Sequence, residues 1–357
     1  MEKKMTRMIV AVGENFNLEN AVCNHGFFMM PPNLWIPTHK SLTRPLRLSN
    51  PSNSLNVSIT QPPNQQFLVI TPQHHHPPPQ FSYQDRQAIR AQVVRMLRIS
   101  AKDEKMVEEF HRIHADAKKS GFARIFRSPT LFEDIVKSIL LCNCTWGRSL
   151  EMAEALCDLR QHCGKKGSKR KRRSGDGSKA VDDDRWQMSR NFPTPKEIAC
   201  LDEETLNRHC NLGYRASIVL DVARNIENGS LNLEVFESAM SDASGIRQHL
   251  LKIKGFGPFT VANIMMCLGF YQHIPVDTET IKHLEEVHGK TTGLSGKTQT
   301  QVIAEIYDKY DPFQCLAYWM EHVQYYEKRV GKLSELPHSQ YRNVATTNLQ
   351  LVRNSGS

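Results

Sequence analysis

The segment Leu250–Thr280 constrains the fold of this chain more than any other part of it. It predicts a short helix ending at Lys252–Lys254, a turn over Gly255-Phe256-Gly257, and an apolar helix that starts near Pro258. Glycine tolerates the backbone of a tight turn, and proline fits the first position of a helix. The sequence therefore predicts two helices joined by a sharp hairpin.

This hairpin is suited to binding a phosphate. Two glycines let backbone N–H groups at the start of the second helix approach an anion closely. A phosphate there accepts those hydrogen bonds and meets the positive end of the helix dipole. Such a contact holds a DNA strand without reading its sequence. We expect Gly255, Gly257 and Thr260 to form a phosphate-binding hairpin, although a plain helix-turn-helix would show the same pattern.

An aspartate follows the hairpin at the start of the next predicted helix. Asp277 lies about twenty residues after Gly257, behind the rigid, extended segment Ile274-Pro275-Val276, and it opens another helix. In isolation, such an aspartate is typical of a helix N-cap. A carboxylate in such a position could also act in chemistry, by stabilising positive charge or by orienting and deprotonating water. Asp277 thus has two interpretations, a cap and a catalytic group.

The pattern of apolar residues divides the chain into an N-terminal β part and a helical remainder. Ser54–Thr60 alternates apolar and polar residues, and Gln66–Thr71 is β-branched and apolar, which predicts strands. From Tyr83 onward, apolar residues recur at helical spacing, as in Phe132–Leu140 and Ala216–Ala223. We expect a mostly α protein with a small β-sheet near its N-terminus.

The positive charge of the chain is concentrated in one segment. The formal net charge is +9, yet Lys165–Arg173 contains seven basic residues and no acidic one, so the rest of the chain carries +2. Charge alone is therefore weak support for a DNA-binding surface. The surrounding residues 164–190 predict a disordered insertion, and its basic core favours a nuclear import signal over a solvated loop.

Cysteine and histidine patterns exclude several kinds of site. The nine cysteines are scattered, none lies after Cys315, and so a C-terminal four-cysteine iron–sulfur loop is excluded. The three adjacent histidines in Pro72–Gln80 belong to a proline-rich linker whose side chains do not converge on one ion. No apolar run reaches the roughly 20 residues of a membrane helix. We expect no metal, no organic cofactor and no membrane partner.

The hairpin followed by a Pro-Val-Asp aspartate resembles the signature of the helix-hairpin-helix (HhH-GPD) DNA glycosylases, which excise bases from DNA. The similarity is greatest to the 8-oxoguanine and alkyladenine glycosylase branches, and it extends over roughly residues 16–333. It implies a two-lobed helical core with an N-terminal antiparallel sheet, and it identifies Asp277 as the catalytic carboxylate. Such hairpins often allow a monovalent cation at their carbonyl groups.

The resemblance also implies other site residues. Asn143 matches an asparagine that contacts the orphaned base in the 8-oxoguanine branch, and Trp146 could wedge nearby. A helix C-cap and a core position are their plainer interpretations. Tyr214 and Arg215, in a segment similar to both branches, are expected to be structural.

Several positions depart from the 8-oxoguanine branch. Phe259 stands where bifunctional members carry a lysine that attacks the sugar, so we expect hydrolysis by water without lyase activity. In the 8-oxoguanine branch a glycine senses the oxidised purine, and His25 of this sequence aligns near that position. Tyr318 and His322 replace a glutamine and a phenylalanine of the pocket; they could contact the base or merely fill a helix face.

The resemblance implies a nuclear base-excision glycosylase that acts as a monomer on double-stranded DNA. It would flip a damaged purine, oxidised or alkylated, out of the duplex and leave an abasic site. The nuclear import machinery would bind Lys165–Arg173. A catalytically inactive DNA-binding protein of this fold is the main alternative. A transcriptional helix-turn-helix protein is another, but it leaves the Pro-Val-Asp sequence unexplained.

The expected organisation follows from these assignments. An N-terminal tail (1–15) precedes a β-sheet domain (16–71) and a linker (72–82). A helical glycosylase domain (83–335) and a flexible C-terminal tail (336–357) follow. The helical domain contains the insertion at 164–190 and the hairpin with its catalytic loop at 250–280.

Overall fold

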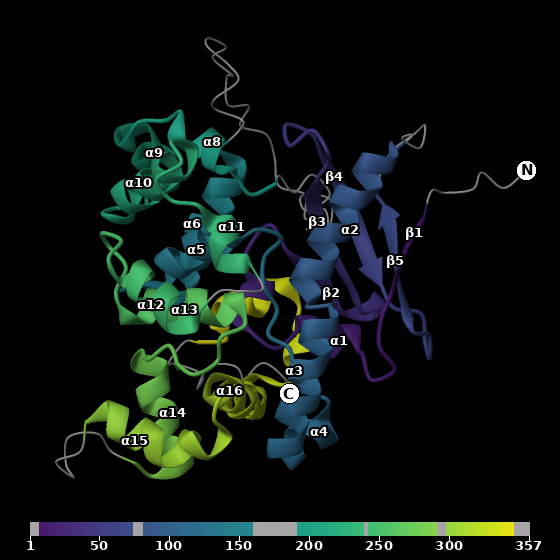
Figure 1. Cartoon of the computed structure of the whole chain (residues 1–357), viewed down its shortest axis with the longest axis vertical. Coiled ribbons are helices and arrows are strands. Elements are labelled where there is room, and N and C mark those ends of the chain that lie inside the picture. The colour runs from purple at the N-terminus through teal and green to yellow at the C-terminus, as the bar shows by residue number, and fades with distance from the viewer. Residues whose placement is uncertain (1–6, 74–80, 160–190, 239–241, 291–297, 346–357) are drawn as a thin grey trace, which may run out of the picture.

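A small sheet and a larger helical body make up the structure, a computed structural model that describes residues 7–73, 81–159, 191–238, 242–290 and 298–345. The sheet lies on one side, with α2 (Tyr83–Leu97) running beside it, and the other helices fill the rest (Figure 1). The mostly α architecture with an N-terminal antiparallel sheet is as expected from the sequence. The basic insertion and its expected import signal lie outside the described residues.

The sheet has five antiparallel strands in the order β1-β5-β4-β3-β2. The two strands predicted from the sequence are confirmed, because β4 spans Ser54–Thr60 and β5 spans Phe67–Pro72. The inward residues of β4 are apolar and buried, so alternate side chains form one face of the core. The remaining strands are β1 (Met8–Ala11), β2 (Leu34–Ile36) and β3 (Ser41–Arg47).

The helices are short and mostly capped by polar side chains. Two of them, α5 and α13, are buried almost throughout and pack against each other at the centre of the body. The other helices surround this pair (Figure 1). Their bounds are α1 Leu18–Val22, α3 Ala101–Ile113, α4 Ala115–Ser120, α5 Leu131–Leu141, α6 Trp146–Asp158, α8 Pro195–Ala199, α9 Glu203–Cys210, α10 Arg215–Glu227, α11 Leu233–Glu237, α12 Ala243–Leu251, α13 Pro258–Leu268, α14 Thr278–His288, α15 Gln299–Tyr307 and α16 Gln314–Val330. Short 3-10 helices are η1 Gly26–Met29, η2 Pro37–His39, η4 Asp308–Tyr310, η5 Leu333–Glu335 and η6 His338–Asn343.

Both ends of the described chain differ from the expected tails. Met8–Ala11, within the predicted N-terminal tail, is a strand whose Met8 and Val10 are buried against β5. At the other end, Tyr341 and Val344 are buried, within the predicted C-terminal tail. The expectation of tails was wrong for residues 8–11 and 336–345, because their apolar side chains complete the core.

A buried ion cluster joins the sheet to the helical body. Arg44 on β3 places its guanidinium 3.0 Å from the Glu133 carboxylate on α5, and Lys137 Nζ lies 2.8 Å from the same carboxylate. All three residues are almost fully buried. Removing one partner from such a cluster leaves an uncompensated charge in the core. The cluster therefore fixes the sheet against α5, whose C-terminal end reaches the cavity described below.

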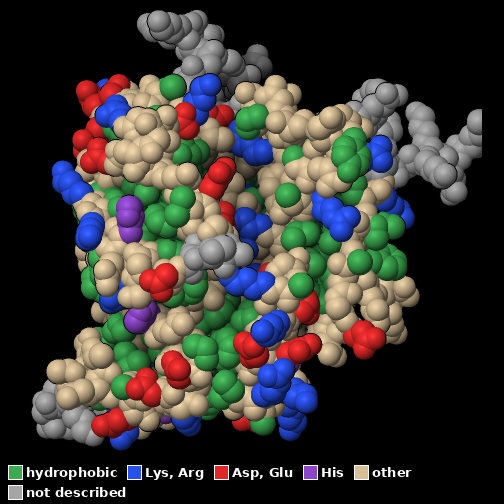
Figure 2. All heavy atoms as spheres, in the orientation of Figure 1, with side chains coloured by type: hydrophobic (Ala, Val, Ile, Leu, Met, Phe, Trp, Pro, Cys, Tyr) green, Lys and Arg blue, Asp and Glu red, His purple; other side chains and the backbone are tan. Residues whose placement is uncertain are grey.

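The visible surface carries acidic and basic side chains intermixed. In Figure 2 neither sign covers a whole face in this view, in agreement with the low net charge outside the basic insertion. No helix among the described residues is long and apolar enough to cross a membrane.

Candidate active site

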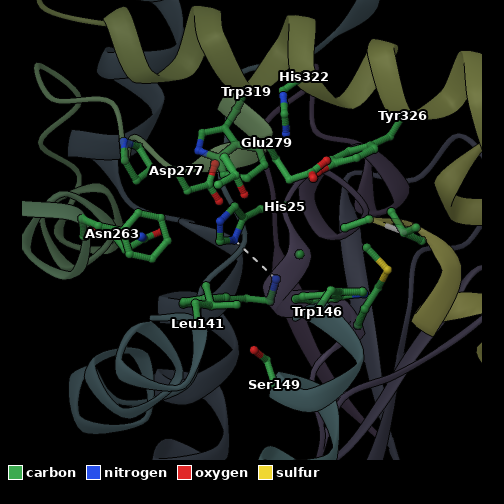
Figure 3. A pocket seen from close by; sticks show the side chains of 18 of the residues that line it. His25, Leu141, Trp146, Ser149, Asn263, Asp277, Glu279, Trp319, His322 and Tyr326 are labelled. Carbon is green, nitrogen blue, oxygen red and sulfur yellow. Dashed lines mark hydrogen bonds between the residues drawn. The ribbon is translucent and has the colours of Figure 1, made fainter. Parts of the chain in front are cut away.

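Three distant parts of the sequence meet around a cavity of about 810 Å³. One wall comes from the residues that precede and begin η1, another from α16, and a third from the ends of α5, α13 and α14 (Figure 3). His25 projects between these walls, and Trp319, His322 and Tyr326 extend from α16 toward it. The volume is within the usual range for small-molecule pockets, about 300–1,000 Å³.

The predicted hairpin is present between α12 and α13, at the molecular surface. Gly255 has φ +88°, and a Cβ atom there would lie 2.6 Å from Ile218 Cδ1 on α10. Gly257 caps α13 with ordinary backbone angles and has open space around its Cα. Gly255 is thus required by the fold, while Gly257 leaves the N-terminus of α13 open to an approaching group.

The side chain of Thr260 is not available to a phosphate. It is buried, and its hydroxyl oxygen lies 3.0 Å from Cys142 Sγ at the end of α5. The hydroxyl therefore faces the core rather than the hairpin surface. A contact between Thr260 and a phosphate is limited to its backbone N–H on the first turn of α13.

Asp277 has both of the features that the sequence left open. It is the N-cap of α14, where Oδ1 accepts a hydrogen bond of 2.8 Å from the Thr280 N–H. The Thr280 hydroxyl lies 3.0 Å from the same oxygen. The carboxyl group also lines the cavity, and the Glu279 N–H is a second backbone donor to it. Asp277 therefore caps α14 and at the same time borders the space open to a bound molecule.

The surroundings of Asp277 raise the pKa of its carboxyl group. Desolvation by the surrounding protein atoms is the main cause, although Asp277 is exposed to solvent through the cavity, which makes the rise a modest one. The nearby charge of Glu279 adds to the rise, and the hydrogen bonds from Thr280 partly offset it. A carboxylate with a raised pKa is a better proton acceptor than an exposed aspartate.

His25 presents a neutral imidazole to the cavity. Burial, together with the charges of Arg98 and Lys137, lowers the pKa of His25 to about 3. Its Nδ1 accepts a hydrogen bond of 3.4 Å from the Phe27 N–H, so the ring proton is on Nε2. Edge-on contact with Trp319, at 4.4 Å between ring centroids, holds the ring in place. His25 therefore brings a hydrogen-bond donor into the predicted base pocket.

Tyr318 and His322 lie on the cavity wall, but their side chains are already engaged. The Tyr318 hydroxyl lies 2.9 Å from the Thr280 hydroxyl. This contact engages Tyr318 with the residue that hydrogen-bonds to Asp277, so its hydroxyl is not free to bind the edge of a base. The His322 ring stacks with Tyr318 and Tyr325, at centroid distances of 5.0 and 5.9 Å. Burial lowers the pKa of His322, so this ring is neutral. Tyr318 and His322 could therefore contact a base only through the ring edges that line the cavity.

Phe259 and Asn263 line the cavity from α13. Phe259 is half-buried, and its carbonyl oxygen accepts a hydrogen bond of 3.0 Å from Asn263. Among the described residues that line the cavity, Lys282 is the one lysine, and its Nζ lies 2.6 Å from Glu279 Oε1. This ion pair was not predicted. A Glu-x-x-Lys spacing places both side chains on one face of the helix that follows Asp277, and that spacing could have indicated the pair.

The loop after α5 presents a different pair of residues from the one predicted. Asn143 is exposed with φ +45°, and its amide donates a hydrogen bond of 3.3 Å to the Tyr214 hydroxyl. Tyr214 is 52% exposed, while Arg215 is buried and donates to the backbone oxygen of Asn143 at 3.1 Å. Arg215 is structural, as expected, and the Tyr214 hydroxyl also donates to the backbone oxygen of Cys142 at 3.4 Å, although its ring is half exposed.

Trp146 lines the same cavity as Asn143, but its ring is held by the C-terminal segment. Its indole N–H donates a hydrogen bond of 2.7 Å to the backbone oxygen of Tyr341, and its ring lies close to Gly26. Of the two interpretations that the sequence left open, these contacts favour a position within the fold over a wedge into DNA.

No protein-family model and no curated protein matches the chain in sequence. Several solved structures match it in fold. MBOgg1 in complex with a low-affinity DNA ligand has a TM-score of 0.61 and 20% identity, covering 93% of this chain and 98% of that one. The 3-methyladenine DNA-glycosylase from Archaeoglobus fulgidus has a TM-score of 0.61 and 16% identity, covering 88% and 97%. The 8-oxoguanine glycosylase/lyase from Clostridium acetobutylicum has a TM-score of 0.59 and 17% identity, covering 91% and 97%.

These likenesses confirm the expected fold. The chain has a helix-hairpin-helix (HhH-GPD) glycosylase-like fold, and the match extends over both the sheet and the helical body. At these identities the match concerns the fold alone.

The raised pKa of Asp277 predicts a stability effect that opposes its role as a cap. Above the ordinary aspartate pKa of about 3.9, the carboxyl group ionises less readily in the folded chain than in the unfolded chain. The ionised Asp277 therefore lowers the free energy of unfolding. Asp277→Asn retains a good N-cap and removes the charge. We expect the variant to be more stable than the wild type at pH 7, and the gain to shrink as the pH falls through the pKa of Asp277. Urea unfolding from pH 7 to 4.5 measures this, and a variant less stable at pH 7 contradicts it.

Proposed function

We propose that this protein is a monofunctional DNA N-glycosylase that removes a damaged purine base, oxidised or alkylated, and leaves an abasic site. One observation carries the proposal: the Asp277 carboxyl group lines a cavity large enough for an extruded base, about twenty residues after a surface hairpin, within a glycosylase-like fold. The relatives in fold are named as glycosylases of 8-oxoguanine and 3-methyladenine.

The chemistry assigned to Asp277 needs no covalent intermediate. As the bond between C1′ and the base nitrogen breaks, positive charge develops on the deoxyribose. The Asp277 carboxylate stabilises this charge and accepts a proton from water, whose oxygen bonds to C1′. The base leaves with the electron pair of the broken bond and takes up a proton. Phe259, at the place of the nucleophilic lysine, cannot attack the sugar.

The contact with DNA is assigned to the hairpin and the loop after α5. The exposed hairpin presents the N-terminus of α13, where a backbone phosphate is favoured. Asn143 and Tyr214 form an exposed, hydrogen-bonded pair that could fill the gap left by an extruded base. A cation at the hairpin carbonyls, a monomeric state and nuclear import through Lys165–Arg173 remain parts of the proposal.

The cavity supports a purine as the extruded base. Its walls are largely aromatic, with Phe259 on one side and Trp319 and Tyr326 on α16 on another, and ring stacking suits a flat, electron-poor base. The Nε2–H donor of His25 supplies a polar contact for the base edge. The Asp277 and Glu279 carboxylates also suit a base with partial positive charge, as alkylation produces.

The two hairpin glycines provide a matched pair of variants. Gly255→Ala should lose at least about 1–2 kcal/mol of stability, because alanine is strained at positive φ and its Cβ meets Ile218. Gly257→Ala should change stability by less than about 0.5 kcal/mol. We expect Gly257→Ala nevertheless to weaken duplex DNA binding, because its methyl group obstructs the approach of a phosphate. Urea unfolding and fluorescence anisotropy measure the two effects, and unchanged DNA affinity in Gly257→Ala would rule out this contact.

The central experiment is a panel of duplexes that each carry one oxidised, alkylated, deaminated or mismatched base. Products are read with and without alkali, since a monofunctional enzyme gives strand breaks only after alkali. We expect release of a damaged purine by the wild type, loss of release in Asp277→Asn, and unchanged DNA binding in that variant. Binding of damaged duplexes without release of any base would instead support the inactive binding protein.

The same panel tests the absence of lyase activity. Borohydride reduction traps a Schiff base between a lysine and the abasic site, so we expect no trapped complex. Lys282→Ala serves as the control because Lys282 lines the cavity. A trapped complex that disappears in Lys282→Ala would assign a lyase step to Lys282 and overturn the monofunctional proposal.

A further inference from the structure

Two histidines and a glutamate converge at the interface of α14 and α16, next to the cavity residues Tyr318 and His322, whose rings the His283 ring contacts edge-on. His283, His288 and Glu321 each place one ligand-type atom within 4.8 Å of the others. His288 Nε2 lies 2.9 Å from Glu321 Oε2, and His283 Nε2 lies 3.6 Å from the same oxygen. Helices α14, α15 and α16 lie together in the lower part of Figure 1.

These distances suit a small four-coordinate cation. Ligands about 2.0–2.2 Å from a tetrahedral ion are about 3.4 Å from one another. Both histidines direct Nε2 to the shared point, and two imidazoles with one carboxylate are a ligand set typical of zinc. The Tyr307 hydroxyl donates a hydrogen bond of 2.7 Å to Glu321 Oε2 and also lies 3.2 Å from His283 Nε2 and 3.4 Å from His288 Nε2. It therefore holds all three ligand atoms together, and a bound ion would replace its contacts with the two histidines.

We propose that His283, His288 and Glu321 bind a Zn²⁺ ion, with water as the fourth ligand. Among the described residues, no lysine or arginine forms an ion pair with Glu321, so a divalent cation would neutralise its charge. The site is open to solvent on one side, because the side chains of His288 and Glu321 are 21% and 25% exposed while His283 is buried. An ion from solvent can therefore reach it.

The surroundings indicate a moderate affinity. His283 Nδ1 is buried and has no hydrogen-bond partner among the described residues, whereas metal-binding histidines usually donate from their second nitrogen. Loss of such a supporting contact commonly lowers affinity about 10–100-fold. We therefore expect micromolar binding.

The ion would connect two walls of the cavity. Helix α14 begins directly after Asp277, and α16 carries Tyr318 and His322. A bond from each helix to one ion would hold these walls at a fixed separation. The proposal concerns metal binding and does not depend on the proposed glycosylase activity.

Metal binding to the full-length protein tests the proposal directly. Zn²⁺ is titrated at pH 7.5 in competition with a chromophoric chelator, and Co²⁺ is used as a spectroscopic substitute. We expect one Zn²⁺ per chain, a rise in melting temperature, and the visible absorption of four-coordinate Co²⁺ without a thiolate charge-transfer band. Cys200→Ser is used as the background because Cys200 is an exposed thiol.

Two variants and a control decide the outcome. His288→Ala removes a ligand, and Glu321→Gln keeps the hydrogen-bonding shape but removes the charge. Each should weaken Zn²⁺ binding at least about tenfold, while His39→Ala, at an exposed histidine on η2, should bind as the background does. Equal binding in all of these proteins, or no binding in any, overturns the proposal and leaves the cluster as a hydrogen-bonded contact between helices.

Discussion

The site depends on one carboxyl group that both caps a helix and lines the cavity. Asp277 Oδ1 accepts the Thr280 N–H at the start of α14, and the same carboxyl group borders the cavity. The helix N-terminus stabilises the negative charge, while the surrounding protein atoms destabilise it. The result is an ionisable group whose position is fixed by a helix and which a bound molecule can reach. Capping and chemistry are thus two uses of the same group.

The fold supplies the rest of the site by bringing distant segments to this group. The sheet is fixed against α5 by the buried Arg44–Glu133 pair, and His25 lies in the same N-terminal part of the chain. Tyr318 reaches Thr280 from α16, so the C-terminal helix supports the cap from behind. The buried C-terminal segment holds Trp146 and closes another side. The proposed activity therefore requires the whole chain rather than the hairpin alone.

The sequence predicted the elements whose signals are local. The glycines at the hairpin, the Pro-Val-Asp segment, the alternation of Ser54–Thr60 and the apolar helix α13 are each read within a few residues. Backbone preferences and hydrophobic periodicity decide such elements. The catalytic assignment of Asp277 came from the resemblance of the hairpin and the Pro-Val-Asp segment to the glycosylase signature, and the structure places its carboxyl group on a cavity wall.

Contacts between distant segments could not be predicted in this way. Thr260 is buried because it lies on the side of α13 that faces α5. No local sequence pattern distinguishes that side of the helix from the side at the hairpin surface. Trp146 is fixed by a hydrogen bond to the backbone of Tyr341, which is 195 residues away and in a polar segment that predicted a tail. Met8–Ala11 becomes a strand only because β5 offers it an open edge. Tertiary context decided all three.

The pH dependence of base release by single-turnover kinetics tests most directly whether the ionised Asp277 is the catalytic group. The rate should fall at acid pH with a midpoint above the ordinary aspartate value of about 3.9. In Thr280→Val the loss of the hydroxyl beside Oδ1 should move that midpoint to higher pH, and Thr280→Ser should restore it. An acid midpoint that is the same in all three proteins would contradict the account.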